Sequence, residues 1–282
     1  MTVASATIRP MTAADVARAA DVIRRNDFGE REQFFAWAIE RPEIRLFVAE
    51  DEAGIAATGC AAANGRVGWV GVIFVRPDRR GSGLGGRMTR TVIADLEERG
   101  CRSQVLVASP AGRPIYERLG FAVVDRQFRY HAPGMGTEQP WRDPRLRPYR
   151  PDDLGAILGL DQAATGEDRS AALRSLASPD ATWVTVDGAD RATGFFLRPP
   201  WRGGAVIAPN PDDGLRLLEL RRRQAPPDGQ AGAGVLASNT IGRARLRAAG
   251  WSEEVANVRM VRGEPLRWNP SAIWGQLNGA LG

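Results

Sequence analysis

Residues 80–86, Arg-Gly-Ser-Gly-Leu-Gly-Gly, are the part of this sequence whose types and spacing point most directly to chemistry. They follow an apolar run that ends at Val75 and precede an amphipathic run from Met88 to Leu96. This order predicts a strand, a glycine loop and a helix. Because glycine lacks a Cβ, the backbone N–H groups of such a loop can converge on an anion, and the helix N-terminus adds its positive dipole. The segment therefore predicts a cradle for a phosphate group.

Two other interpretations of the loop are weaker. Residues 81–86 satisfy the dinucleotide fingerprint G-x-G-x-x-G, but residues 76–80 separate the strand from the first glycine, and three predicted strands precede it. The following strand, residues 104–108, also ends without the acidic residue that would bind a ribose. A flexible spacer is disfavoured because a strong strand and a strong helix bound the loop closely.

The overall composition excludes several classes of protein. The chain has 282 residues, no lysine, a single histidine (His131) and a formal net charge of +5. Walker A, pyridoxal-phosphate and protein-kinase chemistry all need a lysine, so none is expected. Cys60 and Cys101 are too few for a disulfide framework and are expected to be buried, reduced thiols. No apolar run is long enough to span a membrane and no signal pattern opens the chain, so we expect a cytoplasmic protein.

The order of elements around the loop resembles the GNAT superfamily of acyl-CoA N-acyltransferases. The resemblance rests on Arg80-x-x-Gly83-x-Gly85 after the strand "WVGVIFV", and on the later helix with the ending "RPIYERLGF". It implies acetyl-CoA as cosubstrate, with no metal, and a loop that grips the CoA pyrophosphate. It also implies that Tyr116 protonates the departing CoA thiolate, the alternative for Tyr116 being a core aromatic. The cofactor-binding residues implied by the resemblance are Ile73, Phe74, Val75, Arg80, Gly81, Ser82, Gly83, Leu84, Gly85 and Gly86.

A general base is missing from the expected strand. Many family members carry a glutamate there, whereas period-two alternation predicts Ile73, Gly71 and Trp69 on the face of Val75, and none of these accepts a proton. The candidate acceptor-side residues are Asp27, Phe28, Glu30, Trp69 and Asp161, together with Glu32. For Asp27, Glu30 and Glu32 the alternative is a solvated loop that caps the second helix, and for Asp161 it is helix capping and a surface ion pair.

Two segments that resemble each other indicate a duplicated domain. Residues 8–23 and 146–161 share Arg-Pro, a spacer, an aspartate and a helical pattern. Near the end of each half, a predicted helix is followed by a glycine and an aromatic residue, at residues 116–124 and 245–254. The second half lacks the glycine cradle and has Asp212 and Asp213 in its place, which would repel a pyrophosphate. The predicted organisation is a catalytic GNAT domain (1–134), a linker (135–146), a degenerate GNAT-like domain (147–264) and a tail (265–282) that packs as an extra element.

The expected fold class is α+β, a mixed and mostly antiparallel central sheet flanked by helices in two tandem GNAT-like domains. In the first half we expect helices at residues 13–25, 30–39, 85–99 and 112–119. We expect strands at 7–9, 46–50, 56–63, 69–75 and 104–108, and around 121–124 and 127–130. In the second half, the run 221–223 is expected to end a helix.

The predicted function is transfer of an acetyl group from acetyl-CoA to a primary amine of a small molecule or peptide. The alternative is a non-catalytic CoA-binding regulatory module, and a nucleic-acid-binding protein is the third and least favoured class. We expect no nucleic acid or membrane partner and a monomer or homodimer.

Overall fold

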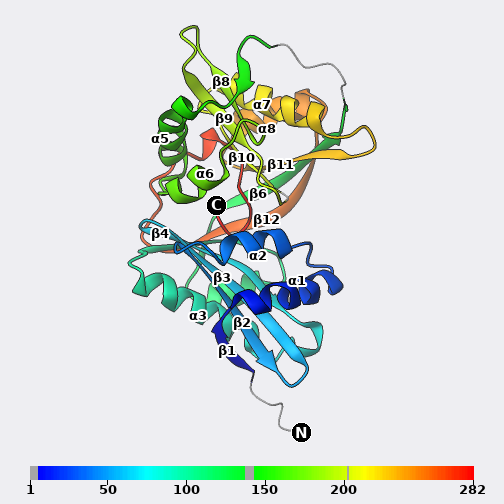
Figure 1. The fold of residues 1–282 in the computed structure, drawn as a ribbon, viewed down its shortest axis with the longest axis vertical. Helices are drawn as coiled ribbons and strands as arrows, with labels where there is room; N and C mark the ends of the chain where they lie inside the picture. Colours follow the sequence, from blue (N-terminus) through cyan, green and yellow to red (C-terminus); the bar gives the residue numbers. More distant parts are fainter. Residues whose placement is uncertain (1–5, 137–142, 202) are drawn as a thin grey trace. The chain divides into compact units, whose positions relative to one another are not determined.

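The structure, a computed structural model, describes residues 6–136, 143–201 and 203–282. The chain forms two compact units, shown as a ribbon in Figure 1. The first unit contains the described residues up to Ala122, Met260–Pro265 and Gly279–Leu281. The second contains Val123–Arg259 and Leu266–Asn278, with Gly282.

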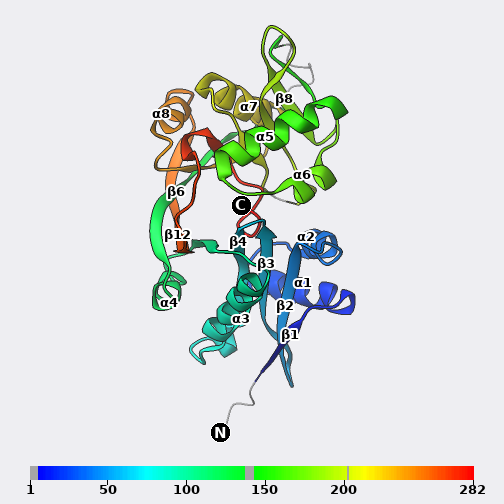
Figure 2. The same cartoon turned by 90° about the vertical axis from the view of Figure 1, so that its left-hand side faces the viewer.

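The first unit is a sheet with helices on both faces. Its strands lie in the order β1-β2-β3-β4-β5, followed by the Met260–Gly263 part of β12. All the pairings from β1 to β4 are antiparallel, whereas β4 and β5 are parallel. Figure 2 shows α3 on one face of these strands and α1 and α2 on the other. The elements are β1 (Thr7–Pro10), α1 (Val16–Arg25), α2 (Glu32–Ala38), β2 (Ile44–Asp51), β3 (Gly54–Asn64), β4 (Val67–Val75), α3 (Leu84–Glu98), β5 (Ser103–Ala108) and α4 (Arg113–Arg118).

Small residues let α3 lie close to the sheet. A Cβ built on Gly59 of β3 would lie 2.8 Å from the sulfur of Met88 and 2.9 Å from Val92, both on α3. A Cβ on Gly68 of β4 would meet Leu96 of the same helix at 2.8 Å. Met88, Val92 and Leu96 are fully buried, so they form the core between α3 and the sheet.

The second unit repeats the order of elements of the first. One sheet has the strand order β13-β10-β9-β8-β7, and β11 pairs with β6 in antiparallel fashion. The C-terminal tail supplies β13, as expected for an added element. The elements are β6 (Ala122–Pro133), β7 (Leu146–Pro148), α5 (Leu154–Thr165), α6 (Ser170–Leu176), β8 (Thr182–Val186), β9 (Ala192–Leu197), β10 (Ala205–Ile207), α7 (Pro211–Gln224), β11 (Gln230–Leu236), α8 (Thr240–Ala248), β12 (Ser252–Gly263) and β13 (Ile273–Gly275).

The repeated sequence segments have the same structural role in both units. Arg9 binds Asp15 at 2.6 Å, and Arg147 binds Asp153 at 2.7 Å. Each aspartate also accepts a backbone N–H three residues earlier, at Thr12 and Arg150. The bridge therefore ties β1 to the turn that begins α1, and β7 to the turn that begins α5. The glycines that close the halves, at φ +86° for residue 120 and +80° for residue 250, adopt the left-handed conformation of a helix C-cap.

The divisions of the chain differ from the predicted domain boundaries because strands are exchanged. β6 follows the N-terminal half in sequence but pairs with β11 of the second unit from Gln127 to Pro133. Conversely, Met260–Gly263, from the C-terminal half, completes the sheet of the first unit beside β5. The first unit consequently ends near residue 122 rather than 134. Of the predicted linker, residues 137–142 lie outside the described residues, and β7 already begins at Leu146.

Several predicted elements differ in detail. The two strands expected around residues 121–124 and 127–130 form one continuous strand, β6, which pairs with β11 from Gln127 to Pro133. The helix expected at 13–25 begins as a single 3₁₀ turn, Ala13–Asp15, before α1. The helix expected at 30–39 is α2, which begins at Glu32 and ends at Ala38. The run Arg221–Arg223 ends α7, as expected.

Two further findings bear on composition. Cys60 and Cys101 are both free and buried, which confirms the prediction for them. Within the part of the chain that the structure describes, no helix is both long enough and apolar enough to cross a membrane.

Candidate active site

Strands β4 and β5 diverge after a short stretch of pairing. They are joined in parallel only from Val67 to Trp69, which face Ser103 to Val105. β4 nevertheless continues to Val75 and β5 to Ala108. Beyond Trp69, the edge of β4 toward β5 therefore carries backbone N–H and C=O groups that no strand of the described chain pairs. An extended, amide-containing ligand arm could pair with this edge as an added strand would.

A β-bulge lies in the part of β4 that is paired with β3 but no longer with β5. Gly71 faces Cys60 and Phe74 faces Thr58, so Val72 and Ile73 together oppose the single residue Gly59. Val72 has φ +47°, a conformation that costs a β-branched residue energy and is found mainly at functional sites. The Thr58 hydroxyl donates to the Val72 carbonyl at 2.9 Å and holds the bulge in place. Bulges of this kind redirect backbone groups next to active sites.

The bulge corrects the predicted alternation along this strand. Period two placed Trp69 and Gly71 on the face of Val75, but the extra residue shifts the register. Phe74, not Val75, shares the face of Gly71, while Val75 lies beside Gly85 of α3, 3.4 Å from the position of its missing Cβ. The conclusion about catalysis is unchanged, because Trp69, Gly71 and Phe74 carry no proton acceptor.

The predicted glycine cradle leads directly into α3. Gly81 and Gly83 have φ of +78° and +80°, and no atom lies within 4 Å of a Cβ built on either. Gly83 is the N-cap of α3, which begins at Leu84. The first N–H groups of a helix have no partner within it, so this open concave turn presents donors and the positive end of the helix dipole. The residues present fit a pyrophosphate.

Arginines divide into two roles around the cradle. Arg76 and Arg79 bind the buried carboxylate of Asp51 at 3.0 and 2.5 Å, and so fix the loop to the end of β2. Burial opposes ionisation of Asp51, but the hydrogen bonds from Arg79 and Arg76 outweigh it and lower its pKa. Arg80, by contrast, is exposed and forms no ion pair with the described residues; its Nε donates to the Val75 carbonyl at 3.2 Å. Its charge is thus available to an anionic ligand.

Tyr116 lies on α4 close to the cradle. The neighbouring Ile115 lies 3.9 Å from the position of a Cβ on Gly85, and the Tyr116 ring packs edge-on against Phe121 at 6.0 Å. No hydrogen bond joins the hydroxyl to the described residues. Burial raises the pKa of Tyr116 to about 12, so the phenol remains protonated at neutral pH and can donate a proton.

The predicted acceptor-side residues of the first unit have different surroundings. Phe28 is 41% exposed and packs on Phe74 at 5.6 Å, which ties the loop between α1 and α2 to the strand with the bulge. Asp27 and Glu30 are exposed on the same loop, and neither carboxylate is bonded to the described residues. Trp69 is fully buried. Arg31, which the sequence analysis missed, stacks over Phe28 at 5.8 Å, and burial lowers its pKa.

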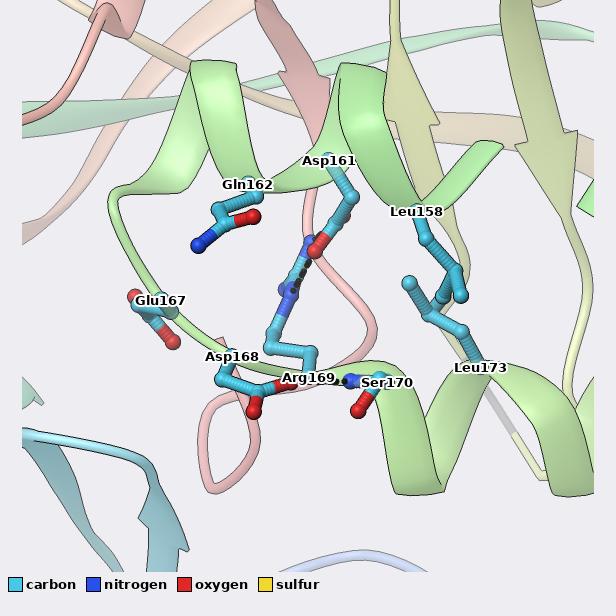
Figure 3. A pocket seen from close by; sticks show the side chains of 8 residues that line it. All are labelled: Leu158, Asp161, Gln162, Glu167, Asp168, Arg169, Ser170 and Leu173. Carbon is cyan, nitrogen blue, oxygen red and sulfur yellow. Dashed lines mark hydrogen bonds and ion pairs between the residues drawn. The ribbon is translucent and has the colours of Figure 1, made fainter. Parts of the chain in front are cut away.

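Asp161 belongs to the second unit and is committed to a buried ion pair. It binds the guanidinium of Arg169 through both oxygens, and both side chains are about 1% exposed. Figure 3 shows the pair crossing a small hollow of about 190 Å³ between α5 and the segment that leads into α6. The alternative of a surface ion pair is therefore wrong, because the loop after α5 folds back over the pair. Nearby, the buried Glu167 binds Arg259, which stacks on Trp268 at 4.4 Å.

Among its described residues, the second unit has no equivalent of the cradle. Asn210 caps α7 by accepting the N–H of Asp212 at 2.8 Å. Asp213 is fully buried and binds Arg145 at 3.0 Å. In place of space for a phosphate, Trp274 lies against the first turn of α7, where a Cβ on Gly214 would approach it to 2.1 Å.

The edge of β10 is also occupied. β13 pairs antiparallel with it, Val206 facing Gly275, whereas the matching edge of β4 is open. Trp274 anchors this strand by donating to the Ala208 carbonyl at 3.2 Å. The chain's own tail thus fills both the strand edge and the helix N-terminus that would receive a cosubstrate in this unit.

These features define the GNAT fold, and comparisons with known proteins agree. Residues 42–123 match the family model described as an acetyltransferase (GNAT) domain, so the first unit carries a GNAT acetyltransferase domain. An uncharacterized N-acetyltransferase of Bacillus subtilis, YitH, is 27% identical over 159 residues, which are 55% of this chain and 56% of that protein. The chain therefore spans about half the length of the curated relatives it matches.

Two solved structures share the fold over nearly the whole chain. A Pyrococcus horikoshii protein named as an acetyltransferase has a TM-score of 0.80 at 18% identity, covering 100% of this chain and 98% of its own. A tandem GNAT protein from the clavulanic acid biosynthesis pathway has a TM-score of 0.63 at 13% identity, covering 93% and 99%. The chain thus has the fold of a tandem GNAT protein.

Proposed function

We propose that the chain transfers an acetyl group from acetyl-CoA to a primary amine of a small molecule or peptide, and that the first unit carries the reaction. The observation that supports this most strongly is the combination of an open β4 edge, a bulge at Val72 and a glycine cradle at the start of α3. Acetyl-CoA would supply an activated acetyl thioester.

Each part of the site would have a separate task. Backbone N–H groups of residues 80–86, with the Arg80 guanidinium, would hold the pyrophosphate through charge-assisted hydrogen bonds. The backbone of Ile73 to Val75 would pair with the pantetheine amides. An N–H of the bulge would polarise the thioester carbonyl, as a preorganised donor does at a developing oxyanion.

The chemistry itself needs one acid and a neutral amine. The amine nitrogen bonds to the carbonyl carbon, the C–S bond breaks, and the thiolate takes the proton of the Tyr116 hydroxyl. The high pKa of Tyr116 keeps that proton in place until the thiolate forms. The nitrogen must lose its own proton to water or to a carboxylate, and Asp27 and Glu30 are the carboxylates of the first unit that we propose for this step.

The second unit would bind no CoA, because its own tail fills the corresponding site. We propose that it serves as a scaffold rather than as a second active site. We further propose a protein that works in the cytoplasm, as a monomer or homodimer, without a metal or nucleic acid.

Thiol release from acetyl-CoA, followed with a chromogenic disulfide across a panel of small amines, amino acids and peptides, tests the proposal. We expect release that depends on the amine and on the enzyme. CoA binding without turnover against any amine would favour the alternative, a regulatory CoA-binding module, for which the lack of a base on β4 is the supporting observation. No binding of CoA would refute both.

A further inference from the structure

The C-terminal segment Gly279–Leu281 packs inside the first unit, although the residues before it belong to the second. Ala280 and Leu281 are each 2% exposed. The Asn64 side chain at the end of β3 donates to the Leu281 carbonyl at 3.2 Å. Both ribbon views show this red segment next to β4 (Figures 1 and 2). The segment is thus a built part of the unit and not a loose end.

The face of the sheet that this segment covers follows from two glycines of β4. A Cβ on Gly68 would meet Leu96 of α3, so Gly68 faces α3. Gly71 is three residues further along a regularly paired stretch and therefore faces the opposite side. A Cβ on Gly71 would lie 2.3 Å from the Cβ and 2.5 Å from the Cα of Ala280. The segment therefore lies on the face away from α3, and no residue with a side chain fits at position 71.

This face also carries the loop between α1 and α2. Phe74 lies on the same side of β4 as Gly71, and the ring of Phe28 contacts it at 5.6 Å. Gly71 directly precedes Val72, the residue of the bulge. In the proposed function the cradle holds the ligand's phosphates on the side of α3, which leaves the opposite side of β4 for the approach of the amine. Ala280 lies over Gly71, which comes one residue before Val72 in β4, where the bulge would hold the thioester carbonyl.

We propose that Gly279–Leu281 forms a wall of the acceptor pocket and sets which amines can enter it. This inference rests on the proposed acetyltransferase function. The segment carries no charged side chain. Ala280 and Leu281 are buried, so they would limit the pocket by filling the space over Gly71, and the exposed Gly279 is the part of the segment that an acceptor could contact.

The test measures kcat/KM for a series of primary amines of increasing apolar bulk, from methylamine to hexylamine and benzylamine, with CoA affinity determined separately. Gly71→Ala forces Ala280 out of place. Gly68→Ala is the control for a clash on the opposite face of the same strand, since there the new methyl group meets the side chain of Leu96 and not the C-terminal segment. We expect Gly71→Ala to change the ratio between small and bulky amines at least tenfold, with CoA affinity within twofold of wild type. Gly68→Ala should leave the ratio unchanged.

Leu281→Ala provides a second variant that adds no clash and should shift the preference toward bulkier amines. If Gly71→Ala fails to fold, the amine preference of Leu281→Ala decides the test. Wild-type turnover with the same amine preference in every folded variant would overturn the inference alone. Absence of wild-type turnover would overturn the proposed function and the inference with it.

Discussion

Substituting aspartate for Gly83 tests the cradle against a matched position in the same helix. Gly83 precedes α3 and Gly100 follows it, with φ of +80° and +81°, and neither has an atom within 4 Å of a built Cβ. Gly83→Asp and Gly100→Asp therefore introduce the same backbone strain, roughly 1–2 kcal/mol at most. The two variants differ only in which end of the helix receives the charge.

The two variants should rank in opposite order for stability and for CoA affinity. A carboxylate is favourable by about 0.3–1 kcal/mol at a helix N-terminus and unfavourable by a similar amount at the C-terminus. Gly83→Asp should thus be the more stable of the two variants. It should nevertheless bind CoA more weakly, because a unit charge about 4 Å from a phosphate costs about 1–4 kcal/mol at an effective dielectric constant between 80 and 20, or roughly 5-fold to 10³-fold in Kd.

Isothermal titration calorimetry with CoA and thermal unfolding of the free proteins measure both quantities. The loss of affinity in Gly83→Asp should shrink as salt is added, since the repulsion is exposed to solvent. Equal losses of affinity in the two variants would mean that the effect is not local to the cradle. An unchanged Kd in a folded Gly83→Asp protein would refute the assignment of the loop.

Three further predictions concern the chemistry and the second unit. Tyr116→Phe should lower kcat about 10²-fold to 10⁴-fold at unchanged CoA affinity. Because burial raises the pKa of Tyr116 to about 12, wild-type kcat/KM should rise with pH up to the pKa of the amine and should not fall again below about pH 10. A fall at lower pH would contradict the role of Tyr116 as the acid. Thr58→Val removes the hydrogen bond to the Val72 carbonyl and should lower kcat without changing CoA affinity, at a cost of roughly 1 kcal/mol in urea unfolding; unchanged kcat would separate the bulge from catalysis. Asp161→Asn leaves the charge of Arg169 buried without its partner, so it should destabilise the protein by about 3–5 kcal/mol. CoA affinity should stay the same. Weaker CoA binding in the folded variant would show that the ion pair contributes to the ligand site.

The sequence predicted those parts of the fold that depend on local patterns. The duplicated Arg-Pro and aspartate segments and the glycines before Phe121 and Trp251 mark element ends in both units, because a cap or a left-handed residue needs particular residue types nearby. The family resemblance placed the loop before α3, and the residues there have the positive φ values that such a turn requires. The exact ends of helices moved by one or two residues.

Features that depend on long-range pairing could not be predicted. The bulge at Val72 is an extra residue relative to β3, so nothing in residues 67–75 alone announces it, and the predicted face of Val75 was wrong for this reason. Asp51 is 25 residues from Arg76 in sequence, and Ala280 is more than 200 from Gly71, so neither contact has a local signal. The exchange of β6 and the end of β12 likewise depends on long-range pairing, and the residues of neither strand indicate which sheet it joins.

If only the first unit binds acetyl-CoA, the chain has a single site for it. Calorimetric titration of the full chain with acetyl-CoA measures the number of sites directly. We expect one site per chain, lost or strongly weakened in Gly83→Asp. Two sites per chain, or a single site that the substitution leaves at full affinity, would contradict it.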